Sequence, residues 1–125
     1  MAHTILVADD DLDNRSIIAA ALSAAGYRVC LAADGRQALL AAARENPSLV
    51  LMDMSLPVLD GWEAARRIKS DPRTSHIPVF AFTAHALAGN ERKARDAGCE
   101  DFIAKPCVPR EVVKRIAARL GRVSC

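Results

Sequence analysis

The stretch Leu49-Val50-Leu51-Met52-Asp53 is an apolar run that stops at a carboxylate, and it decides how the rest of the chain is interpreted. A similar run from Thr4 to Ala8 leads directly into three aspartates, residues 9–11. A β-strand that is buried on both faces cannot carry a charge through its middle, so each charge marks the end of a strand. Carboxyl ends of parallel strands meet at one edge of a sheet, where crowded carboxylates repel each other unless a cation joins them. The pattern therefore predicts an acidic site for a metal ion and a phosphate.

Short aliphatic runs alternate with segments of helical periodicity along the whole chain. The predicted strands are Thr4–Ala8, Arg28–Leu31, Leu49–Met52, Val79–Phe82 and Phe102–Ala104. The predicted helices are Asp13–Ala25, Arg36–Asn46, Gly61–Ser70, Ala88–Ala97 and Pro109–Leu120. Repeated strand-then-helix units predict one parallel sheet with helices on both faces, joined by right-handed crossovers. Neither a linker nor a repeat interrupts the pattern, so we expect a single domain over residues 1–125.

Two helices carry expectations of their own. In the first helix the residues expected to face the core are Ile17, Ile18, Ala21, Leu22 and Ala25. The fourth helix offers little apolar surface, so we expect it to be the element that shifts most readily.

Composition limits the classes of function. The chain has 125 residues, of which 51% are hydrophobic and 26% charged, and its net charge is +2. Because the basic residues are spread along the chain, no nucleic-acid-binding surface is predicted. The apolar runs are far shorter than the roughly 20 residues that span a bilayer, and no signal peptide is recognisable, so no membrane insertion is expected. Four cysteines without a C-x-x-C pair indicate reduced thiols in a cytoplasm.

The polar residues at the predicted strand ends are of types that bind a metal ion or a phosphoryl group. They are Asp9, Asp10, Asp53, Thr83 and Lys105. Mg²⁺ prefers octahedral oxygen coordination, which Asp10 and Asp53 could supply directly while Asp9 orients a water. Aspartate is also a nucleophile for phosphoryl groups, so Asp53 could attack phosphorus. Lys105, the Thr83 hydroxyl and the Ala84 amide would neutralise phosphoryl oxygens.

The segments ILVADDD, LVLMDMSLPVLDGWE, FAFTA and IAKP, in this order and at these spacings, resemble the response-regulator receiver domain of two-component signalling. The resemblance covers essentially the whole chain, and single-domain, chemotaxis-regulator-like members are the nearest kind. It implies an α/β, flavodoxin-like (βα)5 three-layer sandwich with the parallel sheet order 2-1-3-4-5. It also implies Mg²⁺ as cofactor, with Mn²⁺ as a substitute.

The resemblance assigns roles to individual residues. Asp53 would be the phosphoacceptor, Asp9 and Asp10 the metal acids, and the backbone carbonyl of Ser55 the third protein ligand. Lys105 would bind the phosphoryl group and precede a cis bond to Pro106.

Further roles concern switching and the lifetime of the phosphorylated state. Thr83 and Phe102 would form the switch pair, which repacks the face built by the fourth helix, the fifth strand and the fifth helix. Ser55 and His85 would border the phosphoryl group and tune its lifetime, although a surface histidine is an equal alternative for His85.

In this family the phosphoryl donor is a histidine kinase or a histidine phosphotransfer protein, and the signal passes to a downstream target protein by contact. The chain would catalyse only its own phosphorylation and slow dephosphorylation, in the cytoplasm, as a monomer or weak dimer.

Alternatives remain open at this point. The chain could be a receiver excised from a hybrid histidine kinase, or an interaction module that is never phosphorylated. Haloacid-dehalogenase-type phosphohydrolases also use an aspartyl nucleophile, but they carry a second Asp two residues later, where this chain has Ser55. Among structural roles, Asp11 or Asp13 would cap the first helix, Asp60 would cap the third, and Trp62 would pack in the core.

Overall fold

The computed structural model describes residues 3–83, 88–105 and 108–120, without the side chains of residues 88–91. Within these residues the strands are β1 Thr4–Ala8, β2 Arg28–Ala32, β3 Leu49–Asp53, β4 Val79–Thr83 and β5 Asp101–Ala104. The helices are α1 Leu12–Ala24, α2 Gly35–Glu45, α3 Gly61–Ser70, α4 Ala88–Asp96 and α5 Pro109–Leu120. Each strand is followed by a helix, as the periodicities predict.

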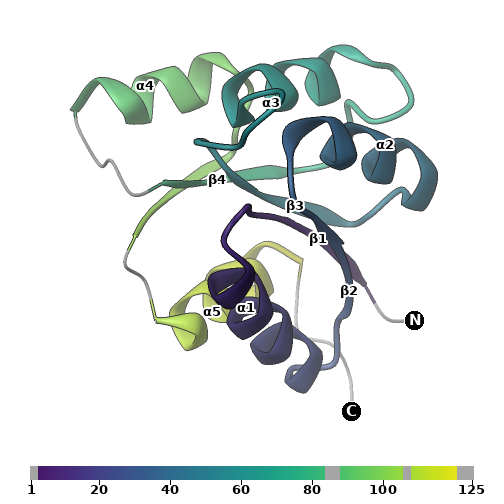
Figure 1. Ribbon diagram of the computed structural model, residues 1–125, viewed down its shortest axis with the longest axis vertical. Helices are drawn as coiled ribbons and strands as arrows, with labels where there is room; N and C mark the ends of the chain where they lie inside the picture. Colours follow the sequence, from purple (N-terminus) through teal and green to yellow (C-terminus); the bar gives the residue numbers. More distant parts are fainter. Residues whose placement is uncertain (1–2, 84–87, 106–107, 121–125) are drawn as a thin grey trace.

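The strands form one parallel sheet in the order β2-β1-β3-β4-β5. Helices α1 and α5 cover one face, and α2, α3 and α4 cover the other (Figure 1). The predicted flavodoxin-like three-layer fold and its strand order are therefore confirmed. None of the described helices is both long and apolar enough to cross a bilayer.

The register of β1 against β3 positions the acidic residues. Ala8 pairs with Met52, so the residues that follow them, Asp9 and Asp53, are neighbours at the carboxyl edge of the sheet. All five residues of β3 are buried, because this strand lies in the middle of the sheet with helices on both sides. Asp53 is the last residue of β3 itself, one position further than the predicted strand.

Two hydrophobic cores fill the layers on either side of the sheet. The core beneath α1 and α5 includes Ile18, Leu22, Val112 and Ile116. In the core beneath α2, α3 and α4 the helices contribute mainly alanines, including Ala38, Ala42, Ala64, Ala65 and Ala94, together with Ile68. The larger side chains of this core come from outside the helices and include Leu6, Met52 and Ile77.

The expected core face of α1 was partly wrong. Ile18 and Leu22 are buried, but Ile17 is 54% exposed and Ala25 is exposed as well. Helix α1 packs against the sheet and one neighbouring helix, so it buries a narrower stripe than the sequence pattern suggested. Gly26 follows the C-cap residue Ala25 with φ of 98°, a backbone conformation that favours glycine and ends the helix.

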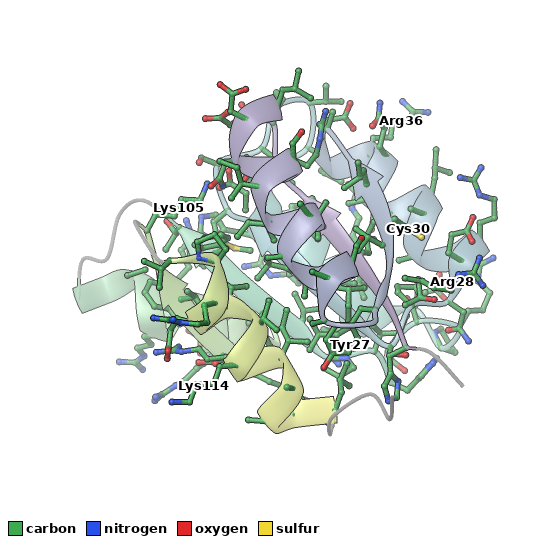
Figure 2. All side chains as sticks on the ribbon, turned by 90° about the horizontal axis from the view of Figure 1, so that it is seen from below. Tyr27, Arg28, Cys30, Arg36, Lys105 and Lys114 are labelled. Carbon is green, nitrogen blue, oxygen red and sulfur yellow. The ribbon has the colours of Figure 1, made fainter. Side chains whose placement is uncertain are left out.

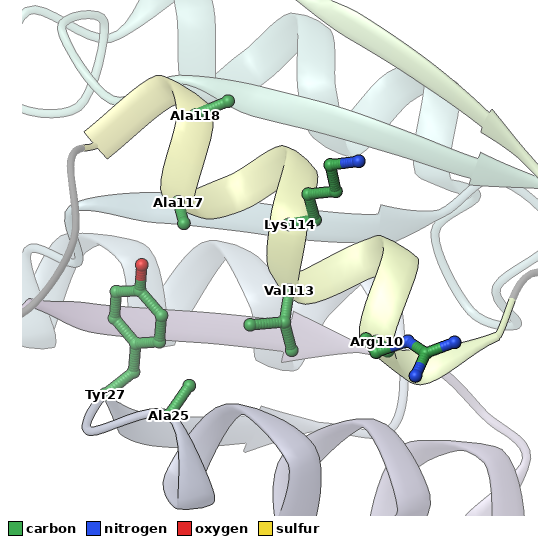
Figure 3. Close-up of a pocket in the computed structure, with 7 residues that line it drawn as sticks. All are labelled: Ala25, Tyr27, Arg110, Val113, Lys114, Ala117 and Ala118. Carbon is green, nitrogen blue, oxygen red and sulfur yellow. The ribbon is translucent and has the colours of Figure 1, made fainter.

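A hollow of about 570 Å³ lies between α5 and the turn that follows α1 (Figure 3). Its lining residues are Ala25, Tyr27, Arg110, Val113, Lys114, Ala117 and Ala118. None of the polar residues predicted for the phosphoryl site lines it, so this hollow is separate from the carboxyl edge of the sheet.

Candidate metal and phosphoacceptor site

Three carboxylates meet at the carboxyl edge of the sheet. One oxygen each from Asp9, Asp10 and Asp53 lies within 4.8 Å of the other two. Asp9 and Asp53 are only 2% and 3% exposed, whereas Asp10 is exposed. Two buried carboxylates side by side with an exposed third form a cluster of negative charge that reaches solvent at Asp10; this cluster at the strand ends is called the crevice below.

Lys105 follows β5 and reaches across the sheet edge to both buried carboxylates. Its Nζ lies 3.1 Å from Oδ2 of Asp9 and 3.1 Å from Oδ2 of Asp53. Burial lowers the pKa of Lys105, but the charges of Asp53 and Asp9 and their hydrogen bonds outweigh burial and raise it overall. The ammonium therefore stays charged and offsets part of the repulsion between the acids.

The loop after β3 fixes Asp53. Oδ1 of Asp53 accepts hydrogen bonds from the backbone N–H and the hydroxyl of Ser55, each at 3.0 Å. Gly61 packs directly on this strand end, because a Cβ added there would lie 2.3 Å from the carbonyl oxygen of Asp53. Any larger residue at position 61 would push the loop away from the carboxylate.

The start of α1 fixes Asp9. Its Oδ1 accepts the backbone N–H of Asp11 at 2.9 Å, and its Oδ2 accepts Nδ2 of Asn14 at 2.5 Å. Nη1 of Arg15 donates to the backbone carbonyl of Asp9 at 3.1 Å. Neither Asn14 nor Arg15 was predicted as a site residue; the one available signal was a polar pair in the first turn of a helix, which is common and weak.

Asp11, rather than Asp13, is the N-cap of α1. Its carboxylate accepts the backbone N–H groups of Asp13 at 3.0 Å and Asn14 at 3.3 Å. The three consecutive aspartates thus divide their roles: two face the crevice and the third starts the helix.

Thr83 and Phe102 lie on the face of the sheet that α4 covers. Thr83 is the buried last residue of β4, and Phe102 is half-buried against the core beneath α2, α3 and α4. Phe102 pairs with Ala81, two positions before Thr83, so both side chains leave the sheet on the same face. The backbone N–H of Lys105 donates to the carbonyl of Thr83 at 2.7 Å, which ties the two strand ends together.

Several predicted features fall outside the described residues. These are Ala84, His85 and the bond between Lys105 and Pro106. Figure 2 shows Lys105 on the other side of the sheet's length from Tyr27 and Arg28, which precede and begin β2.

Two structural expectations are confirmed. Asp60 caps α3, since its carboxylate accepts the N–H of Glu63 at 2.9 Å. Trp62 is half-buried against the core, and Nζ of Lys93 lies 4.7 Å from the centre of its ring. This contact joins α4 to α3 on the surface.

The response regulator receiver domain model matches residues 5–117, and this chain belongs to that family. It is 40% identical over 122 residues to the phosphate regulon transcriptional regulatory protein PhoB of Pseudomonas aeruginosa, covering 98% of this chain and 53% of PhoB. It is 34% identical over 121 residues to the polar-differentiation response regulator DivK of Brucella ovis, covering 97% of this chain and 98% of DivK. The chain thus spans about half of PhoB and nearly all of DivK.

Solved structures of receiver domains and response regulators are similar to this chain in fold. The receiver domain of sensor histidine kinase PA1611 from Pseudomonas aeruginosa PAO1 has a TM-score of 0.86 and is 40% identical, covering 95% of this chain and 97% of that one. That structure has a magnesium ion coordinated in its active-site cleft. The chemotaxis response regulator CheY4 of Vibrio cholerae shares the fold, with a TM-score of 0.89 at 24% identity, over 94% of this chain and 98% of that one.

The donor set in this chain suits a magnesium ion. Asp9, Asp10 and Asp53 offer hard oxygen ligands within one another's reach, and the exposure of Asp10 leaves room for coordinating waters. The described part of the chain thus brings together Asp9, Asp10, Asp53, Lys105 and, on the adjoining strand end, Thr83.

Proposed function

We propose that this chain is a phosphoacceptor response regulator in which Asp53 receives a phosphoryl group with the help of Mg²⁺. The observation that carries the proposal is the position of the Lys105 ammonium, 3.1 Å from both Asp53 and Asp9. A charged donor beside a buried carboxylate can bind an oxygen of a phosphoryl group attached to that carboxylate.

The metal ligands would be Asp10, Asp53 and the backbone carbonyl of Ser55, with Asp9 acting through a water. Three carboxylates outnumber the two cations described beside them, Lys105 and Arg15, so the site keeps a net negative charge that favours a divalent cation. When bound, Mg²⁺ would neutralise a phosphoryl oxygen, and Mn²⁺ offers similar oxygen chemistry.

In the transfer, a carboxylate oxygen of Asp53 attacks phosphorus of a phosphohistidine on a kinase or a histidine phosphotransfer protein. A phosphorus–oxygen bond forms, the phosphorus–nitrogen bond breaks, and the imidazole nitrogen keeps the electron pair and takes up a proton. Lys105 binds one phosphoryl oxygen, and the Thr83 hydroxyl with the Ala84 amide binds another. Among the described residues, Oδ1 of Asp53 accepts two hydrogen bonds from Ser55, whereas Oδ2 accepts one, from Lys105. Oδ2 therefore keeps a lone pair with which it can attack phosphorus.

The output would pass through the switch pair. Thr83 would move toward the phosphoryl group, Phe102 would turn inward, and the α4-β5-α5 face would repack and change its affinity for a target protein. This route is supported by the shared face of Thr83 and Phe102 and by the packing of Phe102 against the core beneath α2, α3 and α4.

Other parts of the function follow from the same assignment. The chain would act as one domain over residues 1–125, in the cytoplasm, as a monomer or weak dimer. It would catalyse only its own phosphorylation and slow dephosphorylation, with Ser55 and His85 setting the lifetime.

The chain could also act within a larger protein. The similarity to the receiver domain of a sensor histidine kinase favours a receiver from a hybrid kinase as the second candidate. The similarity to DivK over nearly its whole length favours a single-domain regulator. Both candidates share the phosphorylation chemistry.

Incubation with acetyl phosphate, with and without Mg²⁺, followed by intact mass spectrometry tests the proposal. We expect a mass increase of one phosphoryl group that requires Mg²⁺ and is lost in Asp53→Asn. Asp13→Asn is the matched control, because Asp13 is exposed and outside the crevice. Labelling of Asp53→Asn at the parental level would contradict the assignment, and sustained turnover of a phosphate ester would instead support a phosphohydrolase.

A further inference from the structure

The two oxygens of the buried Asp9 carboxylate have different kinds of partner. Within residues 3–83, 88–105 and 108–120, Oδ1 accepts one backbone N–H, from Asp11 at 2.9 Å. Oδ2 accepts two side-chain donors, Nδ2 of Asn14 at 2.5 Å and Nζ of Lys105 at 3.1 Å. One of these donors is neutral and belongs to α1, while the other is charged and shared with Asp53.

The two donors differ in their freedom to move. Asn14 has a short side chain in the first turn of α1, and that turn is held by the cap from Asp11. Lys105 carries its ammonium on a flexible four-carbon chain. Under the proposed function, Lys105 must also donate to the phosphoryl group once Asp53 carries it.

When Lys105 turns to the phosphoryl group, Oδ2 of Asp9 loses a hydrogen-bond donor. Asp9 is 2% exposed, and a buried carboxylate oxygen without a donor is costly. Asn14 can prevent this, because its amide stays on Oδ2 after the ammonium leaves. Since the amide is neutral, it also leaves the negative charge of the crevice unchanged.

We propose that Asn14 is a positioning residue for Asp9: its amide keeps the buried carboxylate in place and hydrogen-bonded, so that Lys105 is free to move to the incoming phosphoryl group. Only the part about the movement of Lys105 rests on the proposed function. The hold of Asn14 on Asp9 is independent of any phosphoryl transfer.

A purely structural role for Asn14 makes a different prediction. If Asn14 served only the first turn of α1, the effect of replacing it would not depend on Lys105. If Asn14 and Lys105 share Oδ2 of Asp9, each can compensate for the loss of the other, and the loss of both leaves the oxygen without either side-chain donor. The two roles are therefore separated by a double-mutant cycle.

The first measurement is thermal unfolding of the full chain in EDTA for the parent, Asn14→Leu, Lys105→Met and the double variant. Leucine is close to asparagine in size and suits a helix, so Asn14→Leu is expected to fold. We expect the double variant to unfold at least about 4 °C below the sum of the single effects. Ser16→Leu, an exposed site on the same helix, is the control and should combine additively with Lys105→Met.

The second measurement is the rate of phosphorylation by acetyl phosphate at saturating Mg²⁺, so that altered metal affinity does not enter. Without the amide, Asp9 would retain Lys105 more strongly, and we expect Asn14→Leu to react about tenfold more slowly. Asn14→Gln, which restores an amide, should recover part of the rate, and Ser16→Leu should match the parent.

The outcomes separate the two proposals. Additive unfolding in the cycle, or an unchanged rate for Asn14→Leu in a parent that takes up label, overturns the positioning role. A parent that takes up no label contradicts the proposed function instead, and the unfolding cycle then still decides whether Asn14 holds Asp9.

Discussion

Lys105 and Asp53 are 52 positions apart in the sequence, yet the Lys105 ammonium lies 3.1 Å from the carboxylate that we assign as phosphoacceptor. The same ammonium lies equally close to Asp9. It therefore occupies the space between two acids where a divalent cation would also be attracted. Much of the behaviour expected of this site follows from that competition.

Replacing Lys105 should separate catalysis from metal binding. In Lys105→Met we expect phosphoryl uptake to slow by about 100-fold, since a charged donor to the phosphoryl group is lost. Mg²⁺ should bind more tightly, because a positive charge next to two of the acids is gone. Calorimetric titration with Mg²⁺ and intact-mass kinetics measure the two effects, with the exposed Lys114→Met as control. Weaker Mg²⁺ binding in Lys105→Met would show that the ammonium does not compete with the metal.

Magnesium should stabilise the folded chain. At 100 times its dissociation constant, a ligand that binds only the folded state contributes about 2.7 kcal/mol, which corresponds to roughly 10 °C in the unfolding midpoint. Asp10→Asn removes an exposed ligand of the crevice and should abolish most of this shift. Asp13→Asn should keep it. Differential scanning fluorimetry with Mg²⁺ and with EDTA makes the comparison, and an equal shift in Asp10→Asn would remove Asp10 from the ligand set.

The switch route can be followed by NMR. With Mg²⁺ and beryllium fluoride as a phosphoryl mimic, we expect the amide resonances of Phe102 and of α4 to shift in the parent. In Thr83→Ala these distant shifts should be largely lost, while the resonances next to Asp53 still respond. Ser75→Ala, an exposed hydroxyl outside the face, is the control. Parental shifts at Phe102 in Thr83→Ala would mean that the signal takes another path.

The thiols should differ in reactivity. Burial raises the pKa of Cys99 to about 11, and burial also raises the pKa of Cys30, which is less enclosed. At pH 8 only about one Cys99 thiol in a thousand would be thiolate, the form that reacts. Iodoacetamide should therefore modify Cys30 well before Cys99 in the folded chain, and at similar rates in urea. Peptide mass spectrometry measures both, and rapid labelling of folded Cys99 would contradict its burial.

Acid should weaken the connection between α5 and the start of β5. Nε of Arg119 donates to Oε2 of Glu100 at 2.6 Å, and this hydrogen bond lowers the pKa of Glu100. A lowered folded-state pKa gives stability that is present above the unfolded pKa and is lost as pH falls through the folded value. Both groups are partly exposed, so the effect should stay below about 1 kcal/mol.

In Arg119→Gln the free energy of unfolding should fall less steeply as the pH is lowered, because the ion pair with Glu100 is already absent. Arg92→Gln, at an exposed position, is the control. Urea unfolding between pH 3 and pH 7 measures it. If the parent and Arg119→Gln lose stability in parallel over that range, the ion pair contributes nothing to acid sensitivity.

The sequence alone determined the fold class, and the reason is local. The three inner strands, β1, β3 and β4, are almost wholly apolar runs, as strands buried on both faces require, and each of the five strands is followed by a segment of helical periodicity. The bounds of α3 and α5 match the prediction to the residue, because Asp60 and Asp71 enclose α3 and Pro109 begins α5. The exposed Ile17 shows what the sequence does not predict. The helical period identifies which face of a helix is apolar, but the elements packed against the helix decide how much of that face is buried.

For the site, the sequence determined which residues carry the chemistry, since a polar residue at the end of a buried strand adds little to the packing of the core. Only the tertiary structure decided how they share one another's hydrogen bonds. That Lys105 joins Asp9 to Asp53, that Ser55 holds one oxygen of Asp53, and that Asn14 holds Asp9 all depend on distances between atoms of different elements. A pattern of residue types sets what each strand end can offer, whereas the register of the strands and the start of α1 set which atoms meet.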